Sequence, residues 1–121
     1  MKIREDYTCP LEIVHDIIKA KWKTIIIFLM RSGSVSLSQL EKSIAGISQK
    51  MLLQQLNELR HFGLVDKENA PGYPLHVDYF LTERGKRILQ AIEIMQDVGI
   101  DYMVEHHLTG ILDQKGICYQ K

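Results

Sequence analysis

The polar residues that could do chemistry are concentrated between Ser48 and His61. At 100° per residue along a helix, one face of this stretch is polar throughout, and it carries Lys50, Gln54, Asn57 and His61, with Gln49 on its flank. Glutamine and asparagine amides can pair with the edges of nucleic-acid bases, and lysine can bind phosphate. An ordinary solvated helix face would look the same, so the neighbouring elements must decide between the two interpretations.

The predicted helix that carries this face runs from Ser48 to Phe62. Leu52, Leu56 and Leu59 recur at offsets of four and three on the opposite side, which predicts that they pack inward. Ser48 can cap the helix and direct its first amide groups at a phosphate. The helix is therefore expected to present its polar face to solvent or to a ligand.

A strand–turn–strand pattern follows this helix. Strands are predicted over Val65–Glu68 and Val77–Leu81, and the turn between them contains Pro71, Gly72 and Pro74. Helix, strand, tight turn, strand and helix is the layout of a winged helix-turn-helix, which places one helix in a DNA groove. The predicted fold is therefore mainly α with a small β-hairpin wing, and this context favours base recognition.

The predicted wing is only weakly basic. Lys67 and His76 are its candidate DNA contacts, and they stand against Asp66, Glu68 and Asp78. A wing normally lies along the phosphates or in the minor groove. We therefore expect a small contribution from the wing to affinity, or one carried by backbone amides.

Three shorter helices are predicted upstream. Apolar residues at helical spacing indicate helices over residues 10–19 and over residues 22–31. A third, short helix carries Leu40 and can be capped by either Ser36 or Ser38. Ser38 is also a candidate DNA contact at the edge of the reading module.

The last predicted helix begins after Thr82 and has an apolar stripe that extends beyond what a small core needs. The stripe has steps of three and four residues and consists of Ile88, Ala91, Ile92, Met95, Val98 and Tyr102. A second copy of the chain is the simplest cover for it, so these residues are the candidate dimer interface. A dimer also suits a pseudo-palindromic operator on double-stranded DNA, with half-sites one helical turn apart.

Composition bounds the class of protein. The chain has 121 residues, is 45% hydrophobic and has zero net charge, which suits one globular domain over residues 1–121 and argues against a general polyanion binder. Residues 1–90 carry 13 Lys/Arg against 10 Asp/Glu, so the basic excess lies on the predicted reading module. No signal peptide or membrane span is visible, which predicts a cytoplasmic protein without membrane contact.

Specific runs of residues resemble the HxlR family of bacterial transcription regulators. The motifs that carry the resemblance are Ile47-Ser48-Gln49-Lys50-Met51-Leu52, Gly63-Leu64-Val65 and Tyr79-x-Leu81-Thr82-x-x-Gly85. The match covers residues 9–103, in order and at the expected spacing, and leaves residues 104–121 as a C-terminal extension. The resemblance implies a winged-helix regulator that dimerises through its terminal helices.

The sequence departs from the family pattern at three places. Lys19-Ala20-Lys21 stands where the family has Gly-Gly-Lys, and Ser36-Leu37 replaces Arg-Phe before the third helix. In the wing, Leu75-His76 replaces Pro-Arg. The second and third replacements each remove an arginine, and the second removes an expected phosphate contact. All three departures therefore bear on the target sequence and the affinity rather than on the fold.

The two cysteines are redox candidates. The resemblance implies a sensing role for Cys9, because family members often carry a cysteine just before the first helix and some use it to sense oxidants or electrophiles. At the start of a helix the positive end of the dipole favours the thiolate, whereas Glu5 and Asp6 oppose it. Cys118 is a candidate disulfide partner from the other subunit. The alternative is that Cys9 is a small, partly buried apolar residue and Cys118 is unrelated.

Together these features predict a dimeric, sequence-specific DNA-binding transcription regulator that acts as a repressor and can respond to oxidants or electrophiles through Cys9. A compact dimer without a contact domain acts most simply by occluding promoters, which favours repression. A winged-helix protein-interaction module without a DNA role is the alternative. No cofactor, metal site or enzyme activity is expected, since His106, His107 and Cys118 have poor ligand spacing. A small-molecule effector is also compatible with the pattern.

Overall fold

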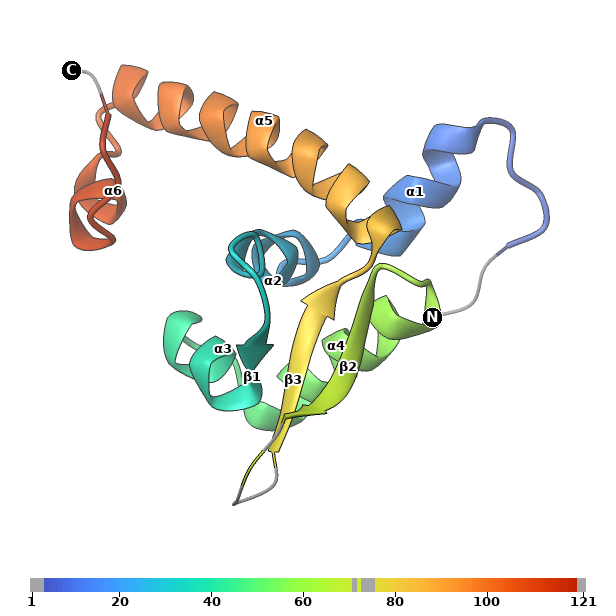
Figure 1. Ribbon diagram of the computed structural model, residues 1–121. Coiled ribbons are helices and arrows are strands. Elements are labelled where there is room, and N and C mark those ends of the chain that lie inside the picture. The colour runs from blue at the N-terminus through green and yellow to red at the C-terminus, as the bar shows by residue number, and fades with distance from the viewer. Residues whose placement is uncertain (1–3, 71, 73–75, 120–121) are drawn as a thin grey trace. The chain divides into compact units, whose positions relative to one another are not determined.

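A computed structural model describes residues 4–70, 72 and 76–119 (Figure 1). The chain forms two compact units that divide between Leu89 and Gln90, inside its longest helix. In chain order the elements are α1 (Pro10–Ile18), α2 (Lys23–Leu29), β1 (Val35–Ser36), α3 (Leu37–Ser43), α4 (Gln49–His61), β2 (Val65–Ala70), β3 (His76–Leu81), α5 (Glu83–Glu105) and α6 (Gly110–Gln114). The mainly helical fold with a small antiparallel sheet is as predicted.

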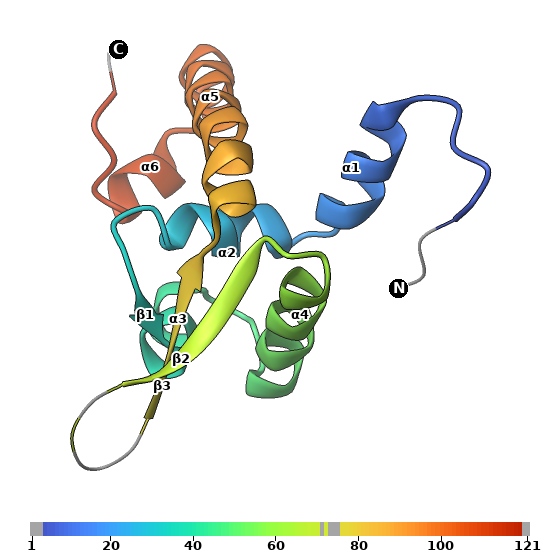
Figure 2. The same cartoon turned by 45° about the vertical axis from the view of Figure 1, so that its right-hand side comes forward.

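The sheet of the first unit has three antiparallel strands in the order β1-β3-β2. Strands β2 and β3 form the predicted hairpin, with Val65 opposite Leu81 and Lys67 opposite Tyr79. Strand β1 was not predicted; it joins the sheet through Val35, opposite Tyr79. Figure 2 shows β3 lying between β1 and β2. Pro71, Pro74 and Leu75 lie outside the described residues.

The core of the first unit is built on the apolar face of α4. Leu52, Leu56 and Leu59 are fully buried, which confirms their predicted inward orientation. Side chains from α2, α3 and the sheet complete this core; they include Ile26, Ile27, Met30, Leu40, Ile44, Leu64, Val65, Tyr79 and Leu81. With one face of α4 committed to the core, its other face is left at the surface.

Local sequence determines where α4 begins and ends. The Ser48 side chain accepts a hydrogen bond from the Met51 backbone amide at 3.1 Å, which satisfies one of the free amides of the first turn. At the other end Gly63 has φ of 75°, a left-handed conformation that glycine adopts without steric cost. The chain then reverses, and the Leu64 amide donates to the Leu59 carbonyl at 3.0 Å.

The junction between the hairpin and α5 explains the Thr-x-x-Gly motif. The Thr82 hydroxyl donates to the Gly63 carbonyl at 2.5 Å and accepts from the Gly85 amide at 3.1 Å. A Cβ on Gly85 would lie 2.0 Å from the Leu64 carbonyl oxygen, so only glycine fits this position. The first turn of α5 is therefore locked against the end of α4 and the start of β2.

The open choice of cap for α3 is settled in favour of Ser36. Its hydroxyl accepts from the Gln39 amide at 3.2 Å, and the Gln39 side chain accepts from the Ser36 amide at 2.8 Å. This reciprocal pair is a capping box. Ser38 is the second residue of α3, with its side chain exposed and its hydroxyl 3.3 Å from that of Ser36.

The second unit consists of the remainder of α5 and the short helix α6. Sequence reasoning missed α6, which has only five residues and no side-chain hydrogen bond at its N-cap. Leu112 of α6 is buried, as is Ile92 of α5. Across the described part of the chain, no helix is both long enough and apolar enough to cross a membrane.

Candidate nucleic-acid interface

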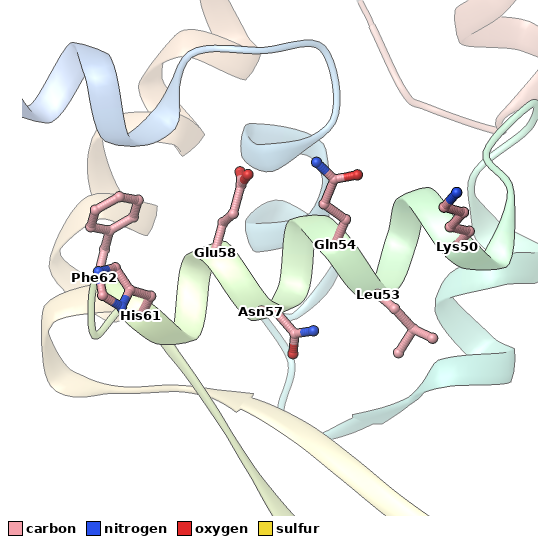
Figure 3. Close-up of a pocket in the computed structure, with 7 residues that line it drawn as sticks. All are labelled: Lys50, Leu53, Gln54, Asn57, Glu58, His61 and Phe62. Atoms are coloured by element: carbon pink, nitrogen blue, oxygen red, sulfur yellow. The ribbon is translucent and has the colours of Figure 1, made fainter. Parts of the chain in front are cut away.

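The outward face of α4 is polar and accessible, as the sequence predicted. Gln49, Lys50, Gln54, Asn57 and His61 are all exposed. Most of them line an open hollow of about 590 Å³ along the helix (Figure 3), which is formed by Lys50, Leu53, Gln54, Asn57, Glu58, His61 and Phe62. Amide, cationic and imidazole side chains therefore share one concave surface.

Three members of this surface were missed by sequence reasoning. Leu53 and Phe62 are half-buried beside the polar side chains, and Glu58 places a carboxylate between Gln54 and His61. The i,i+4 spacing of Gln54 and Glu58 is a signal that could have identified the carboxylate, because residues four apart are neighbours on a helix surface.

Glu58 has an unusual partner, Lys23 at the start of α2. The Lys23 Nζ lies 2.6 Å from the Glu58 Oε2, and the Lys23 side chain is only 3% exposed against 22% for Glu58. The hydrogen bond from Lys23 is the largest influence on Glu58 and, with the lysine charge, holds the pKa of that carboxyl below its usual range despite partial burial. A charge pair thus connects the core to the outward face of α4.

The two cationic candidates on the wing have different surroundings. Lys67 on β2 is exposed, whereas His76 on β3 lies with its Nε2 3.7 Å from the Asp78 Oδ1. Glu68 is directly opposite Asp78 across the hairpin, so two carboxylates face each other there. Like charges in opposing positions weaken a strand pair and also disfavour close approach to phosphate. The weakly basic character expected for the wing therefore holds in three dimensions.

Cys9 and Cys118 are both exposed free thiols. Cys9 occupies the N-cap position of α1 in an extended conformation, with φ of −155°, and its side chain makes no capping hydrogen bond. An exposed sulfur without a hydrogen-bonding task at the cap is accessible to a reagent in solution. Cys118 lies in the second unit, four residues beyond α6.

The segment before Cys9 is anchored on α1 by a polar network. The Tyr7 hydroxyl donates to the Asp16 Oδ2 at 2.8 Å, and the Arg4 Nε lies 3.2 Å from the same oxygen. The Tyr7 hydrogen bond, followed by the Arg4 charge, lowers the pKa of Asp16. Thr8 also hydrogen-bonds the Glu12 carboxylate. Cys9 is thus held between an ordered segment and the first turn of α1.

The predicted interface stripe on α5 is mostly uncovered. Met95, Val98 and Tyr102 are more than half exposed, as is Ile94 beside them. Ala91 is exposed and Ile88 half-buried. Ile92 is 4% exposed and is therefore not available to a partner in this conformation, so the exposed stripe is narrower than the sequence predicted.

No group of three histidine, cysteine or carboxylate side chains capable of holding a metal ion occurs among residues 4–70, 72 and 76–119.

A capped helix with an exposed polar face, next to an antiparallel hairpin, defines a winged helix-turn-helix protein. The HxlR-like helix-turn-helix family model matches residues 17–107, and the chain belongs to this family. It is therefore a helix-turn-helix transcription regulator, as the resemblance in its motifs implied.

Individual relatives agree with this assignment. An uncharacterized HTH-type transcriptional regulator of Methanothermobacter thermautotrophicus is 32% identical over 98 residues, which cover 81% of this chain and 75% of the relative. The uncharacterized HTH-type regulator YkvN of Bacillus subtilis is 30% identical over 104 residues, covering 86% and 88%. The solved structure of the redox regulator HypR in its reduced form superposes with a TM-score of 0.71 at 29% identity, covering 88% of this chain and 99% of that one.

Proposed function

We propose that this regulator binds double-stranded DNA as a homodimer, inserts α4 into the major groove of each half-site and represses transcription by occluding promoters. The observation that carries the proposal is the exposed face of α4, where Lys50, Gln54 and Asn57 share one concave surface. Amides of this kind pair with base edges, and lysine neutralises phosphate. The Ser48-capped helix start offers backbone amides to a further phosphate.

Other contacts would come from the periphery of the first unit. Gln49 and His61, which are exposed near the two ends of α4, would extend the DNA-contacting face. Ser38 on α3 is also exposed, and its hydroxyl would donate to the DNA backbone. Lys67 and His76 would contribute the wing contacts, with modest affinity because of the carboxylates around them. The cations and hydroxyls fix the position on the duplex, whereas the α4 amides read sequence.

The homodimer is supported by the uncovered stripe of α5. Met95, Val98 and Tyr102 are large side chains that water contacts in the isolated chain, and a two-fold partner would bury them against their own counterparts. Two copies of α4 related by a two-fold axis require a pseudo-palindromic operator. Residues 1–121 would then act as one winged-helix domain, with residues 104–121 as an extension beyond the helix of the interface.

A thiol switch at Cys9 is the third part of the proposal. Cys9 is exposed at an anchored helix start, and the similar protein HypR is described as a redox regulator. A two-electron oxidant such as diamide would accept the two electrons and two protons released when the Cys9 and Cys118 thiols of two subunits form an S–S bond. A bond across the dimer would change the spacing of the two α4 helices.

The test is fluorescence anisotropy with the DNA upstream of the protein's own gene, using reduced and diamide-treated protein. We expect specific binding with a steep salt dependence, reduced in slope by about one unit in Lys50→Ala, because one phosphate contact is lost. Oxidation should alter binding by the wild type and leave Cys9→Ser unaffected. Specific DNA binding that is unchanged by oxidation would contradict the proposed thiol switch but not the DNA-binding role.

A matched control variant separates the loss of a specific DNA contact from the loss of one positive charge anywhere on the protein. Lys86→Ala removes an exposed lysine of α5 that pairs with Glu83 and lies outside the α4 face. If Lys50→Ala and Lys86→Ala weaken binding equally, α4 is not the reading helix. Absence of duplex binding at low salt, together with capture of a protein partner, would favour the protein-interaction alternative instead.

A further inference from the structure

Lys23 is a buried charge that the proposed function does not use. It is the first residue of α2 and is 2% exposed, although lysine is among the residues least often buried. Its ammonium group lies 2.6 Å from the Glu58 Oε2, and Glu58 belongs to the hollow on the outward face of α4. An ion pair of this kind adds little net stability compared with apolar packing at the same place. Its position between core and reading face is therefore the more informative property.

Glu58 connects this buried charge to a candidate base-reading side chain. Gln54 precedes it by one helical turn, and Figure 3 shows both side chains projecting from the same side of α4, with the Gln54 amide nitrogen turned to the Glu58 side. A hydrogen bond from the Gln54 side chain is one of the influences that lower the pKa of Glu58, after the larger influence of Lys23. An ionised carboxylate can only accept hydrogen bonds, so Gln54 must present its amino group to it.

We propose that Lys23 and Glu58 are positioning residues that hold Gln54 in the orientation that reads adenine. The inference rests on the proposed role of α4 in the major groove. The Gln54 amino group has two N–H bonds, of which Glu58 takes one. The remaining N–H and the carbonyl oxygen form the pair that matches N7 and the N6 amino group of adenine. Guanine presents acceptors at both N7 and O6, so the held carbonyl oxygen would face an oxygen.

The ion pair with Lys23 restricts the motion of Glu58 and therefore of the Gln54 amide. Without the ammonium group, Glu58 could move toward solvent or accept from other donors, and Gln54 could rotate. With it, the carboxylate is fixed from the core side, and the rotamer of Gln54 is selected before DNA arrives. Pre-organisation of a polar side chain reduces the entropy lost on binding and raises selectivity between bases.

The test compares base preferences of variants on duplexes selected from a randomised half-site library. Wild-type protein should prefer adenine over guanine at one position by ~10-fold or more, and Gln54→Ala should remove that preference. Lys23→Met, which keeps an unbranched side chain in the core, should reduce the preference at the same position only. Lys86→Met, which breaks the exposed Lys86–Glu83 pair on α5, should leave every position unchanged.

Glu58→Gln provides a sharper variant, because it should change the preference rather than weaken it. The new carbonyl oxygen would accept from Lys23, and the new amino group would face Gln54. Gln54 would then turn its carbonyl oxygen inward and direct its amino group outward, toward the O6 and N7 acceptors of guanine. The adenine preference at that position should fall, and guanine should be accepted.

A measurement without DNA separates this proposal from the proposed function. In the 15N NMR spectrum of the free protein, the Gln54 side-chain amino group should be ordered in the wild type and mobile in Lys23→Met. If the Gln54 amino group is ordered but the protein binds no duplex, Lys23 and Glu58 still position Gln54, and the proposed DNA role is overturned. If the wild type binds specifically and both Lys23→Met and Glu58→Gln lower affinity equally on all sequences, the Lys23–Glu58 pair is purely structural. The proposed positioning of Gln54 would then be overturned. A Gln54 amide that is equally mobile in both proteins would also overturn it.

Discussion

Helices α4 and α5 both carry a long apolar stripe, but the stripe of α4 is buried, whereas most of the stripe of α5 is exposed. Leu52, Leu56 and Leu59 are fully buried, whereas Val98 and Tyr102 on α5 are 62% and 58% exposed. The polar faces differ as well, because the outward face of α4 is a concave surface of amides and cations. One helix thus exposes what it needs to meet a polar ligand, and the other exposes what a core would normally hide.

The difference shows that similar apolar patterns in one chain can be buried in different ways. Spacing at three and four residues specifies a helix and an apolar face in both cases. It does not specify whether the cover for that face comes from the same chain. In α4 the cover is α2, α3 and the sheet, and in α5 a second copy is proposed. Substitutions on the two helices should therefore have different effects.

The largest expected effect is on the buried stripe of α4. Leu56→Ala should lower the free energy of unfolding by about 2–5 kcal/mol, because it leaves a cavity in a fully packed core. Asn57→Ala, at the next position on the exposed face, should stay within about 0.5 kcal/mol. Chemical denaturation followed by circular dichroism measures both. Equal effects would mean that α4 is not packed as described.

The next effect concerns association rather than folding. Val98→Asp should raise the dissociation constant of the homodimer by about 100-fold or more, since the burial of two valine side chains is lost and two charges are placed in the contact. The folded monomer should keep its helical signal. Sedimentation equilibrium gives the constant, with Gln90→Asp as the control because it adds the same charge outside the stripe. A monomeric wild type would contradict the proposed interface.

Loss of the N-terminal caps of α4 and α5 should have smaller effects on stability. Ser48→Ala should destabilise the protein by about 1 kcal/mol, because the Met51 amide loses its capping oxygen. Thr82→Val should have a larger effect, since its hydroxyl both caps α5 and donates to the Gly63 carbonyl. Thermal unfolding of the two variants measures this order. The reverse order would show that the junction before α5 is not tied through Thr82.

The smallest effect is a pH dependence that distinguishes the ion pairs of the two helices. The pKa of Glu58 is lowered from its ordinary value of 4.5, mainly by the Lys23 hydrogen bond. The stabilisation is therefore present above that value and is lost as the pH falls through the lower, folded-state pKa. The stability difference between wild type and Lys23→Met should shrink below about pH 4.5. Lys86→Met, which breaks an exposed ion pair with Glu83, is the matched control for the loss of a lysine.

Much of the fold followed from the sequence because its elements have strong local signals. Three signals specify local structure without reference to distant residues: the α4 stripe, the Ser48 cap and the turn-forming residues between the two strands of the hairpin. Strand β1 was missed because two residues have no periodicity and become a strand only by pairing with β3. Ile92 was assigned to the stripe because its burial depends on packing that spacing alone does not reveal.

The candidate site was predictable to a similar degree. The exposed residues of α4 follow from helical geometry, and each of them lies on the outward face. The Lys23–Glu58 pair could not be predicted, since the two residues are far apart in sequence and a lysine at a helix start is normally solvated. Tertiary packing alone brings the ammonium group into the core.

The contact between Gly85 and the Leu64 carbonyl limits how this regulator can change shape. Because the backbone of the first turn of α5 lies against that of Leu64, directly before β2, with no room for a methyl group, this turn cannot rotate independently of the start of the hairpin. A signal that reorients the later part of α5 must bend or twist the helix beyond this point, or carry the hairpin and the end of α4 with it. Gly85 thus couples the first turn of α5 to the end of α4 and the start of the hairpin, so that these three segments move together.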